Sequence, residues 1–427
     1  MQKDNVYSNK VFVKNKYFTT IYLMGLFGVF ASIKIGASES SSLSPIIFPF
    51  LYLFTLYSLT KVRFSKKDSF IQALCIFLFS GLLITALLSY NPIASSLSVI
   101  YLFFNFIFGI WLAKTHTKDE FLIRTLEALT FTLLISIILL FVRPDLVIYV
   151  DPLDRDSIIG LPNFKGLFPH KIHAGIYCII GFILSRYFYL KVKTRKYLFL
   201  ATFFVIGVLG SGSSLAFATL LLVSVITPTI KFIKLSFGLQ GLFLLTFVTI
   251  LIIVFGIYFG LSKYILESLG RDATLTGRTS IWEFGIGYIK SHPFIGGGFN
   301  VFFSESTDSP AQELWARSAF YKAPSFHNGY IEIIAEAGII GSFSFLYILF
   351  NTFKKAIKQN DTLSIAIFII CLIANMAAAI LVKQNSFFFV FLIYNCLDFK
   401  GLARSRINKA IYSSNKEQPY PHLVKLL

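Results

Sequence analysis

The sequence predicts an all-α polytopic membrane protein, and its composition and the length of its apolar runs carry this prediction. Of the 427 residues, 56% are hydrophobic and only 14% are charged, and phenylalanine occurs 49 times. A soluble domain has roughly 25% charged residues, so this chain has too few charges to cover a surface that faces water. High hydrophobicity excludes a disordered chain. The 4 cysteines lie inside apolar runs, which argues against a disulfide scaffold.

Apolar runs of about 17–25 residues can cross the hydrocarbon core of a bilayer as helices. We expect about twelve such spans, of which the sixth and seventh are interrupted or short and the twelfth is weak. Their expected limits are 17–33, 43–60, 69–89, 96–113, 121–142, 172–190, 197–212, 214–230, 240–260, 332–352, 363–382 and 385–399.

The basic residues predict the orientation of these spans. If the N-terminus is cytoplasmic, the basic clusters at 61–67, 191–196 and 354–358 face inside, whereas the outer connection 90–95 has no Lys or Arg. This distribution follows the positive-inside rule. The net charge of +18 therefore reflects topology. We expect no nucleic-acid partner, because the charges are scattered over separate inner loops.

Two long loops fall outside, at 143–171 and 261–331. The second has helical periodicity around 280–290 and 311–321, so we expect it to form a partly helical cap between the ninth and tenth spans. The predicted organisation is a cytoplasmic N-terminus at 1–16, spans one to nine at 17–260, the large periplasmic loop at 261–331, spans ten to twelve at 332–399 and a basic cytoplasmic tail at 400–427.

The outer loops contain 4 of the 6 histidines and many cations that run against the positive-inside bias. Each cation is either a solvated loop charge or headgroup contact, or a ligand for an anion, since Arg and Lys both bind phosphate. His327 lies just before an apolar helical run, and Asn328 can cap that helix. Glu332 and Glu336 are four residues apart and share one face of it.

We expect no metal site, although two histidines have a spacing that could bind zinc. His170 and His173 have a spacing that can ligate zinc on one helical turn, but no nearby Cys or carboxylate completes a set of four ligands. A hydrolase of the G-x-S-x-G type is not expected either. The small residues at 210–214 lie between two spans, where they allow close packing of helices.

Two motifs at the ends of the large loop form a pair. The first reads T-G-R-T-x-x-W…P-x-x-G-x-G-F at 276–299, and the second reads H-N-x-Y…E-x-G at 327–338. Together they resemble the O-antigen ligase and polymerase superfamily (WaaL and Wzy). The stretch G-x-F-x-H-K at 166–171 resembles the polymerase branch that makes exopolysaccharide or O-antigen.

The resemblance implies a glycosyltransferase of the bacterial inner membrane whose active site faces the periplasm. Such enzymes transfer a glycan from undecaprenyl diphosphate to an acceptor sugar hydroxyl. The expected partners are this lipid-linked oligosaccharide, an acceptor glycan or lipid A–core, membrane lipids and a chain-length regulator. We expect inversion at the anomeric carbon and neither a metal nor another cofactor.

The resemblance also implies roles for individual residues. The family's loop His and loop Arg match His327 and Arg278, which we expect to be catalytic, with His327 as the general base. The expected ligands of the diphosphate or the sugars are Lys171, His170, Arg155, Arg271, Asn328 and Tyr330. The chain departs from the family pattern at Ile172, where Asn is frequent, and at Ser214, where many members have an Arg. Lys171 or Arg155 would then have to supply the missing cation.

Three functions remain open at this stage. A polymerase of repeat units is the leading hypothesis, and a ligase that attaches glycan to lipid A–core is the alternative. A transporter of the lipid-linked glycan is a third class. It would place ionisable groups within its spans near the membrane midplane, whereas the predicted spans are nearly free of charge.

Overall fold

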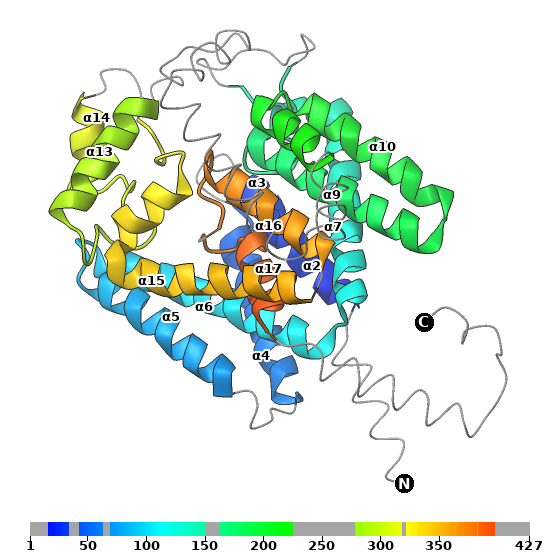
Figure 1. Ribbon diagram of the computed structural model, residues 1–427. Helices are drawn as coiled ribbons and strands as arrows, with labels where there is room; N and C mark the ends of the chain where they lie inside the picture. Colours follow the sequence, from blue (N-terminus) through cyan, green and yellow to red (C-terminus); the bar gives the residue numbers. More distant parts are fainter. Residues whose placement is uncertain are drawn as a thin grey trace, which may run out of the picture.

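The computed structural model describes residues 16–33, 42–62, 69–150, 162–224, 278–317, 322–359, 361–381 and 383–397. The secondary structure of these residues is helical, with an isolated antiparallel bridge between Ile148 and Phe164 (Figure 1). The helices are α2 (Lys16–Leu26), α3 (Val29–Ser32), α4 (Ser44–Thr60), α5 (Ser69–Leu87), α6 (Pro92–Thr115), α7 (Lys118–Val142), α8 (Pro144–Val147), α9 (Lys171–Val192), α10 (Arg195–Gly210), α13 (Arg278–Ser291), α14 (Ala311–Arg317), α15 (Gly329–Lys358), α16 (Thr362–Asn375) and α17 (Phe387–Cys396).

The apolar helices make the chain a multi-pass membrane protein. Among the described residues, α6, α7, α9 and α15 are long and apolar enough to cross a bilayer. Shorter apolar helices are α4, α16, α17, Ala73–Leu87 of α5, and Ser214–Ser224. The expected spans that fall on described residues coincide with helices, although the first is divided into α2 and α3. The expected span at 240–260 lies outside the described residues.

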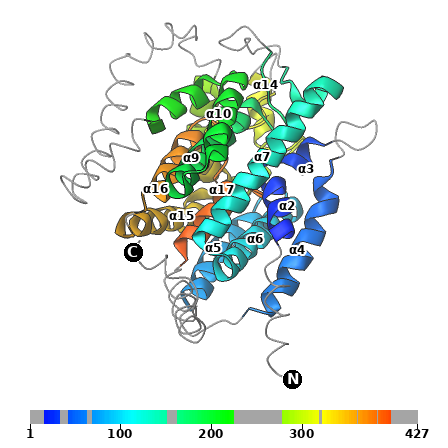
Figure 2. The same cartoon turned by 90° about the vertical axis from the view of Figure 1, so that its right-hand side faces the viewer.

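Helix α17 lies at the centre of the bundle. Nearly all of its side chains are buried, as expected for a helix that is apolar on every face. It packs against α6 and α15, and α15 also packs against α5 (Figures 1 and 2). Other helices present large apolar residues outward, among them Phe50 of α4 and Ile76 of α5. These residues form the surface that would face lipid.

Small residues let α9 pack closely against the segment that follows α10. A Cβ atom at Gly175 would lie 2.4 Å from the Cβ of Ala216 and 2.8 Å from the Oγ of Ser211. The expectation that the small residues around 210–214 permit close helix packing is therefore confirmed at this contact. The packing fixes the first turn of α9, which begins at Lys171.

The described part of the large loop forms a small folded unit with its own apolar core. The expected helical segments are present as α13 and α14, and α14 ends at Arg317. The core contains Ile281, Phe302, Leu314, Trp315 and Phe326. In Figure 1 the two helices lie to one side of the bundle, near the N-terminal half of α15. We call this unit the cap.

Hydrogen bonds between backbone atoms attach the cap to α15. Gly297 N–H donates to Ala335 O (2.8 Å) and Gly298 N–H to Glu336 O (2.8 Å). On the other side of a kink in α15, Ile339 N–H donates to Pro293 O (2.8 Å). The kink is at Gly338, whose φ is 59° and whose added Cβ would lie 2.2 Å from Phe294 O. Only glycine fits here, because both the left-handed backbone and the close approach exclude a side chain.

Candidate active site

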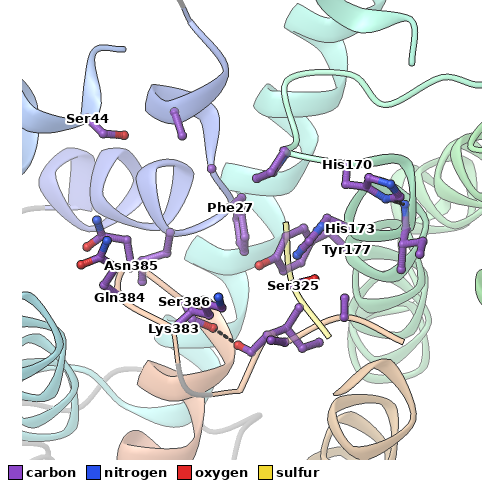
Figure 3. Close-up of a pocket in the computed structure, with 18 of the residues that line it drawn as sticks. Phe27, Ser44, His170, His173, Tyr177, Ser325, Lys383, Gln384, Asn385 and Ser386 are labelled. Atoms are coloured by element: carbon purple, nitrogen blue, oxygen red, sulfur yellow. Dashed lines mark hydrogen bonds between the residues drawn. The ribbon is translucent and has the colours of Figure 1, made fainter. Parts of the chain in front are cut away.

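A cavity of about 490 Å³ lies where α2, α9, the segment before α15 and the connection between α16 and α17 meet. Its polar lining includes His170, His173, Ser325, His327 and Lys383. Figure 3 shows His170, His173 and Tyr177 on one wall, with Lys383, Gln384, Asn385 and Ser386 across from them. Segments that are far apart in the sequence therefore contribute to one polar hollow. The break between α2 and α3 supplies Phe27 to the same lining.

The backbone around His327 is fixed by several contacts. His327 has a φ of 49°, which is uncommon for a residue other than glycine. Its N–H donates to Ser325 Oγ (3.2 Å). The preceding residue, Phe326, is held at both polar atoms: its N–H donates to Glu332 Oε2 (3.1 Å) and its carbonyl accepts from Trp282 Nε1 (2.8 Å). Strained backbone of this kind persists only where its surroundings determine it, and it is frequent at functional sites.

A hydrogen bond from Trp282 joins α13, which begins at Arg278, to the residue before His327. Trp282 is one helical turn after Arg278, the first residue of α13. By binding Phe326, Trp282 places the N-terminal turn of α13 beside the segment that carries His327. The spacing R-x-x-x-W in the first motif thus places the start of α13 near the segment that carries the histidine of the second motif.

His170 has a rigid setting, which the sequence did not indicate. It directly follows Pro169, and histidine is not among the residue types that are preferred as helix N-caps. His170 is the N-cap of α9: its Nδ1 accepts from Ile172 N–H (3.1 Å), while its Nε2 lies 2.9 Å from the hydroxyl of Tyr149. With one ring nitrogen accepting a backbone N–H, the neutral ring carries its proton on Nε2 and donates to Tyr149.

Positive charge gathers around His170. Burial lowers the pKa of His170 to about 3, and the charges of His173, His327, Lys171 and Arg278 act in the same direction. The ring is therefore neutral at physiological pH. His327, Lys171 and Arg278 therefore each lie within electrostatic reach of His170. Lys171 is buried, and its ammonium lies 5.8 Å from the centre of the Tyr149 ring.

An ion pair between Lys383, which is 31% exposed and lines the cavity, and the buried Glu332 lies beside the site. Lys383 Nζ lies 2.5 Å from Glu332 Oε1, and the Glu332 side chain is only 2% exposed. The other carboxylate oxygen of Glu332 binds the N–H of Phe326. Lys383 also reaches Asn300 Oδ1 (3.5 Å), and Asn300 N–H donates to Glu336 Oε2 (3.0 Å). Glu332 thus connects Lys383 to the residue before His327.

Asn328 and Tyr330 belong to the scaffold of the site. The side chain of Asn328 caps α15 by accepting from Tyr330 N–H (3.0 Å) and Ile331 N–H (3.4 Å), which confirms the expected cap. The hydroxyl of Tyr330 donates to Leu372 O of α16 (3.0 Å). Neither residue is part of the cavity lining, and their expected contacts with substrate stay a prediction. Arg155 and Arg271 lie outside the described residues.

The described residues offer no group of three or more His, Cys, Asp or Glu that could hold a metal. His170 and His173 are neighbours, with ring centres 6.4 Å apart at an angle of 77°. Nδ1 of His170 is occupied by the helix cap. Positive groups are present instead: Lys383 lines the cavity, and Lys171 and Arg278 act on His170, which also lines it.

Comparison with known proteins gives two matches. Residues 175–346 match a protein family described as O-Antigen ligase. The chain is also 30% identical over 239 residues to the exopolysaccharide production protein ExoQ of Rhizobium meliloti (strain 1021). This match covers 49% of the chain, and the chain spans about half the length of this curated relative (49%).

The family match runs from the first turns of α9, just after the His170–Lys171 pair, to the middle of α15. It therefore includes Arg278, His327 and both halves of the motif pair. The same segment brings the two motifs together through Trp282 and Phe326. Residues 175–346 are therefore similar to the O-antigen ligase family, and about half of the chain is similar to an exopolysaccharide production protein.

Proposed function

We propose that the protein is a membrane glycosyltransferase that joins glycan repeat units at the periplasmic face of the inner membrane. The donor is a glycan on undecaprenyl diphosphate, and the acceptor is a sugar hydroxyl of a second chain. The observation that carries the proposal is the setting of His327. The residue before it, Phe326, is held at both of its polar backbone atoms, and His327 lines a cavity beside His170, on which the charges of Lys171 and Arg278 act.

In the proposed reaction, the acceptor oxygen attacks the anomeric carbon while its proton passes to the His327 imidazole. The bond from that carbon to the diphosphate oxygen breaks, and the diphosphate leaves with the electron pair. Attack from the face opposite to the leaving group inverts the anomeric centre. Arg278 and Lys171 stabilise the departing anion, a kind of contribution worth roughly 3–4 kcal/mol for each well-placed donor. No step requires a metal ion.

Geometry and charge favour His327 over His170 as the base. The low pKa of His170, about 3, makes this ring a weak proton acceptor at neutral pH, and efficient general bases have a pKa near the working pH. Both nitrogens of His170 are also engaged, one by the helix cap and the other by Tyr149. We assign His170 to holding Tyr149 and the first turn of α9.

The assignment of the base is tested with purified protein in nanodiscs and a lipid-linked donor. His327→Asn is the most informative variant, because Asn tolerates the left-handed backbone but cannot act as a base. Turnover should fall about 10²–10⁴-fold, with unchanged thermal unfolding and donor binding. Full turnover by His327→Asn would overturn the assignment. Loss of wild-type turnover in EDTA, with recovery on adding a divalent metal, would overturn the metal-free mechanism.

The polymerase and the ligase differ in the acceptor and are separated by the glycans of a deletion strain. A single repeat that remains on lipid A–core, with loss of long chains, indicates a polymerase. Complete absence of glycan from the core indicates a ligase. We favour the polymerase because of the stretch at 166–171 and the similarity to an exopolysaccharide production protein. A transporter would leave the lipid-linked unit on the inner leaflet.

The proposed topology has about twelve crossings, with the cap outside. It is tested by labelling Ser306→Cys in the cap and Ser65→Cys in the first expected inner loop with an impermeant thiol reagent. In intact spheroplasts, Ser306→Cys should be labelled and Ser65→Cys should be protected. The opposite pattern would reverse the orientation.

A further inference from the structure

A second hollow lies in the cap, between α13 and α14, and we call it the α13–α14 groove. Its volume is about 570 Å³. Its lining includes Glu283, Phe284, Tyr288, His292, Glu313 and Arg317. Phe284, Tyr288 and His292 follow one another at intervals of four residues, so their side chains share one face of the helix. None of these residues takes part in the proposed transfer reaction.

The groove contains a flat aromatic surface. The rings of Tyr288 and His292 are stacked, with centres 4.3 Å apart and planes inclined by 15°. Phe302 packs edge-on against Tyr288 (4.9 Å, 86°) and holds it in place. Burial raises the pKa of Tyr288, so the phenol keeps its proton and can donate a hydrogen bond. The negative face of an aromatic ring attracts the C–H groups on the flat side of a pyranose.

Charged groups border this surface. Arg317 and Glu313 form an exposed ion pair (2.5 Å), and the guanidinium lies 5.6 Å from the centre of the Phe284 ring. An exposed pair of this type adds little to stability. Its donors and acceptors can, however, bind adjacent hydroxyl groups. The border has two carboxylates, Glu283 and Glu313, and one guanidinium, Arg317. Its net charge is therefore negative, which favours a neutral, hydroxyl-rich ligand over a polyanion.

Gly287 keeps the floor of the groove open. It lies within α13, where glycine is about 1 kcal/mol less favourable than alanine. A Cβ atom at Gly287 would meet nothing within 4 Å, so packing does not require glycine here. The neighbouring Gly285 differs, because its added Cβ would lie 2.7 Å from atoms of Phe326 and Ile331. Gly285 serves helix packing, whereas Gly287 leaves space at the lining of the groove.

We propose that the α13–α14 groove is a saccharide subsite that holds glycan residues remote from the bond being formed. This inference rests on the proposed function. Helix α13 begins at Arg278, beside His327, and rises about 1.5 Å per residue. His292, just after its last turn, is therefore roughly 20 Å along the helix axis from the reacting groups. At this distance the groove meets sugars of the acceptor chain that are several residues away from the bond being formed.

The test uses full-length protein in nanodiscs and oligosaccharides of one and of three repeat units. These probes come from partial hydrolysis of the polysaccharide made by cells that carry the gene. Gly287→Trp fills the groove without a clash at Cβ, and Tyr288→Ala removes the aromatic surface. The matched control is Ile286→Trp, which adds the same ring at an exposed position of α13 that does not line the groove.

Binding is measured by saturation transfer from protein to sugar protons, and turnover is measured separately with each oligosaccharide as acceptor. We expect Gly287→Trp and Tyr288→Ala to lose saturation transfer, to raise KM for the longer acceptor about tenfold (about 1.4 kcal/mol) and to make shorter products. Transfer to the single repeat unit and the behaviour of Ile286→Trp should stay unchanged. Wild-type binding and chain length in both groove variants would overturn the subsite. Saccharide binding by a wild-type protein that transfers no sugar would support the subsite and overturn the proposed function.

Discussion

The ion pair between Lys383 and Glu332 makes a quantitative prediction about the site. The two charges are 2.5 Å apart, and Glu332 is nearly inaccessible to solvent. Removing one partner of a buried pair leaves the other charge without compensation and typically costs 3–5 kcal/mol. We therefore expect Lys383→Met to destabilise the protein by about 3–5 kcal/mol. Removing both charges should cost much less, since a buried pair often contributes little relative to neutral residues.

The double variant Lys383→Met, Glu332→Gln is the decisive member of the series. The amide oxygen of the introduced glutamine can still accept the N–H of Phe326, so the segment before His327 keeps its hydrogen bond. The summed effects of the two single substitutions should exceed that of the double variant by about 2 kcal/mol or more, because residues in direct contact are coupled. The stabilities are measured by thermal unfolding in one detergent, and turnover is measured in the same preparations.

Turnover should depend on the hydrogen bond from Phe326 N–H to the Glu332 side chain. Glu332→Leu removes the acceptor for Phe326 as well as the charge, so turnover should fall further in Lys383→Met, Glu332→Leu than in the double variant with Glu332→Gln. Additive single effects would refute the coupling of the two charges. Equal turnover in the two double variants would refute the role of Glu332 in positioning His327.

Three further predictions concern the residues around the cavity. Arg278→Lys keeps the charge but loses the planar fork of donors, so turnover should fall strongly at equal protein level; near-normal glycan length in cells with Arg278→Ala would remove Arg278 from the site. Gly338→Ala places a Cβ 2.2 Å from Phe294 O on a backbone with φ of 59°, so thermal stability should fall by about 1–3 kcal/mol, and an unchanged Tm would refute the fixed kink. His170 has a folded pKa of about 3 against 6.5 for the unfolded chain, so the unfolded state binds more protons between these values and stability falls as the pH drops through this window. His170→Asn removes this titrating group but keeps an acceptor for the helix cap. The variant should therefore lose less stability than the wild type between pH 7.5 and pH 5, by up to about 2 kcal/mol. Thermal unfolding at both pH values measures the difference.

The helices were the part of the fold that the sequence could predict, because an apolar run long enough to cross a bilayer has few alternatives to a helix. The first and last residues of the helices were harder to predict from the sequence. Helix α7 begins at Lys118, where Thr117 and Glu120 form a capping box. That T-x-x-E signal is present in the sequence, but we placed the start at 121 by hydrophobicity alone. The break between α2 and α3 has no comparable signal in the hydrophobic pattern.

The site was predicted where local signals were strong. Asn328 before an apolar run indicated a helix cap, and the cap is present. Lys383 was missed, although a lone cation in the expected outer connection between the last two spans runs against the positive-inside bias. Its partner Glu332 is 51 positions earlier in the chain. No pattern of hydrophobicity or spacing pairs two such residues, because their contact depends on how α15 packs against α16 and α17.

The packing of the cap explains why the two motifs occur together. The glycines of the first motif donate backbone hydrogen bonds to Ala335 and Glu336 of the second, and Gly338 makes room for the turn at Phe294. These contacts use backbone atoms, so they require glycine at a few positions and leave most side chains of the cap unconstrained. A hydrogen bond from Trp282 to Phe326 also joins α13 to the segment that places His327 at the cavity, whereas the α13–α14 groove is built from side chains that do not make these backbone contacts. Changes in the groove can therefore alter which glycan is held while the catalytic groups keep their positions. This separation also accounts for what the motifs could indicate. Their fixed positions specify how the cap joins α15, whereas the proposed saccharide subsite depends on side chains at their variable positions and on α14.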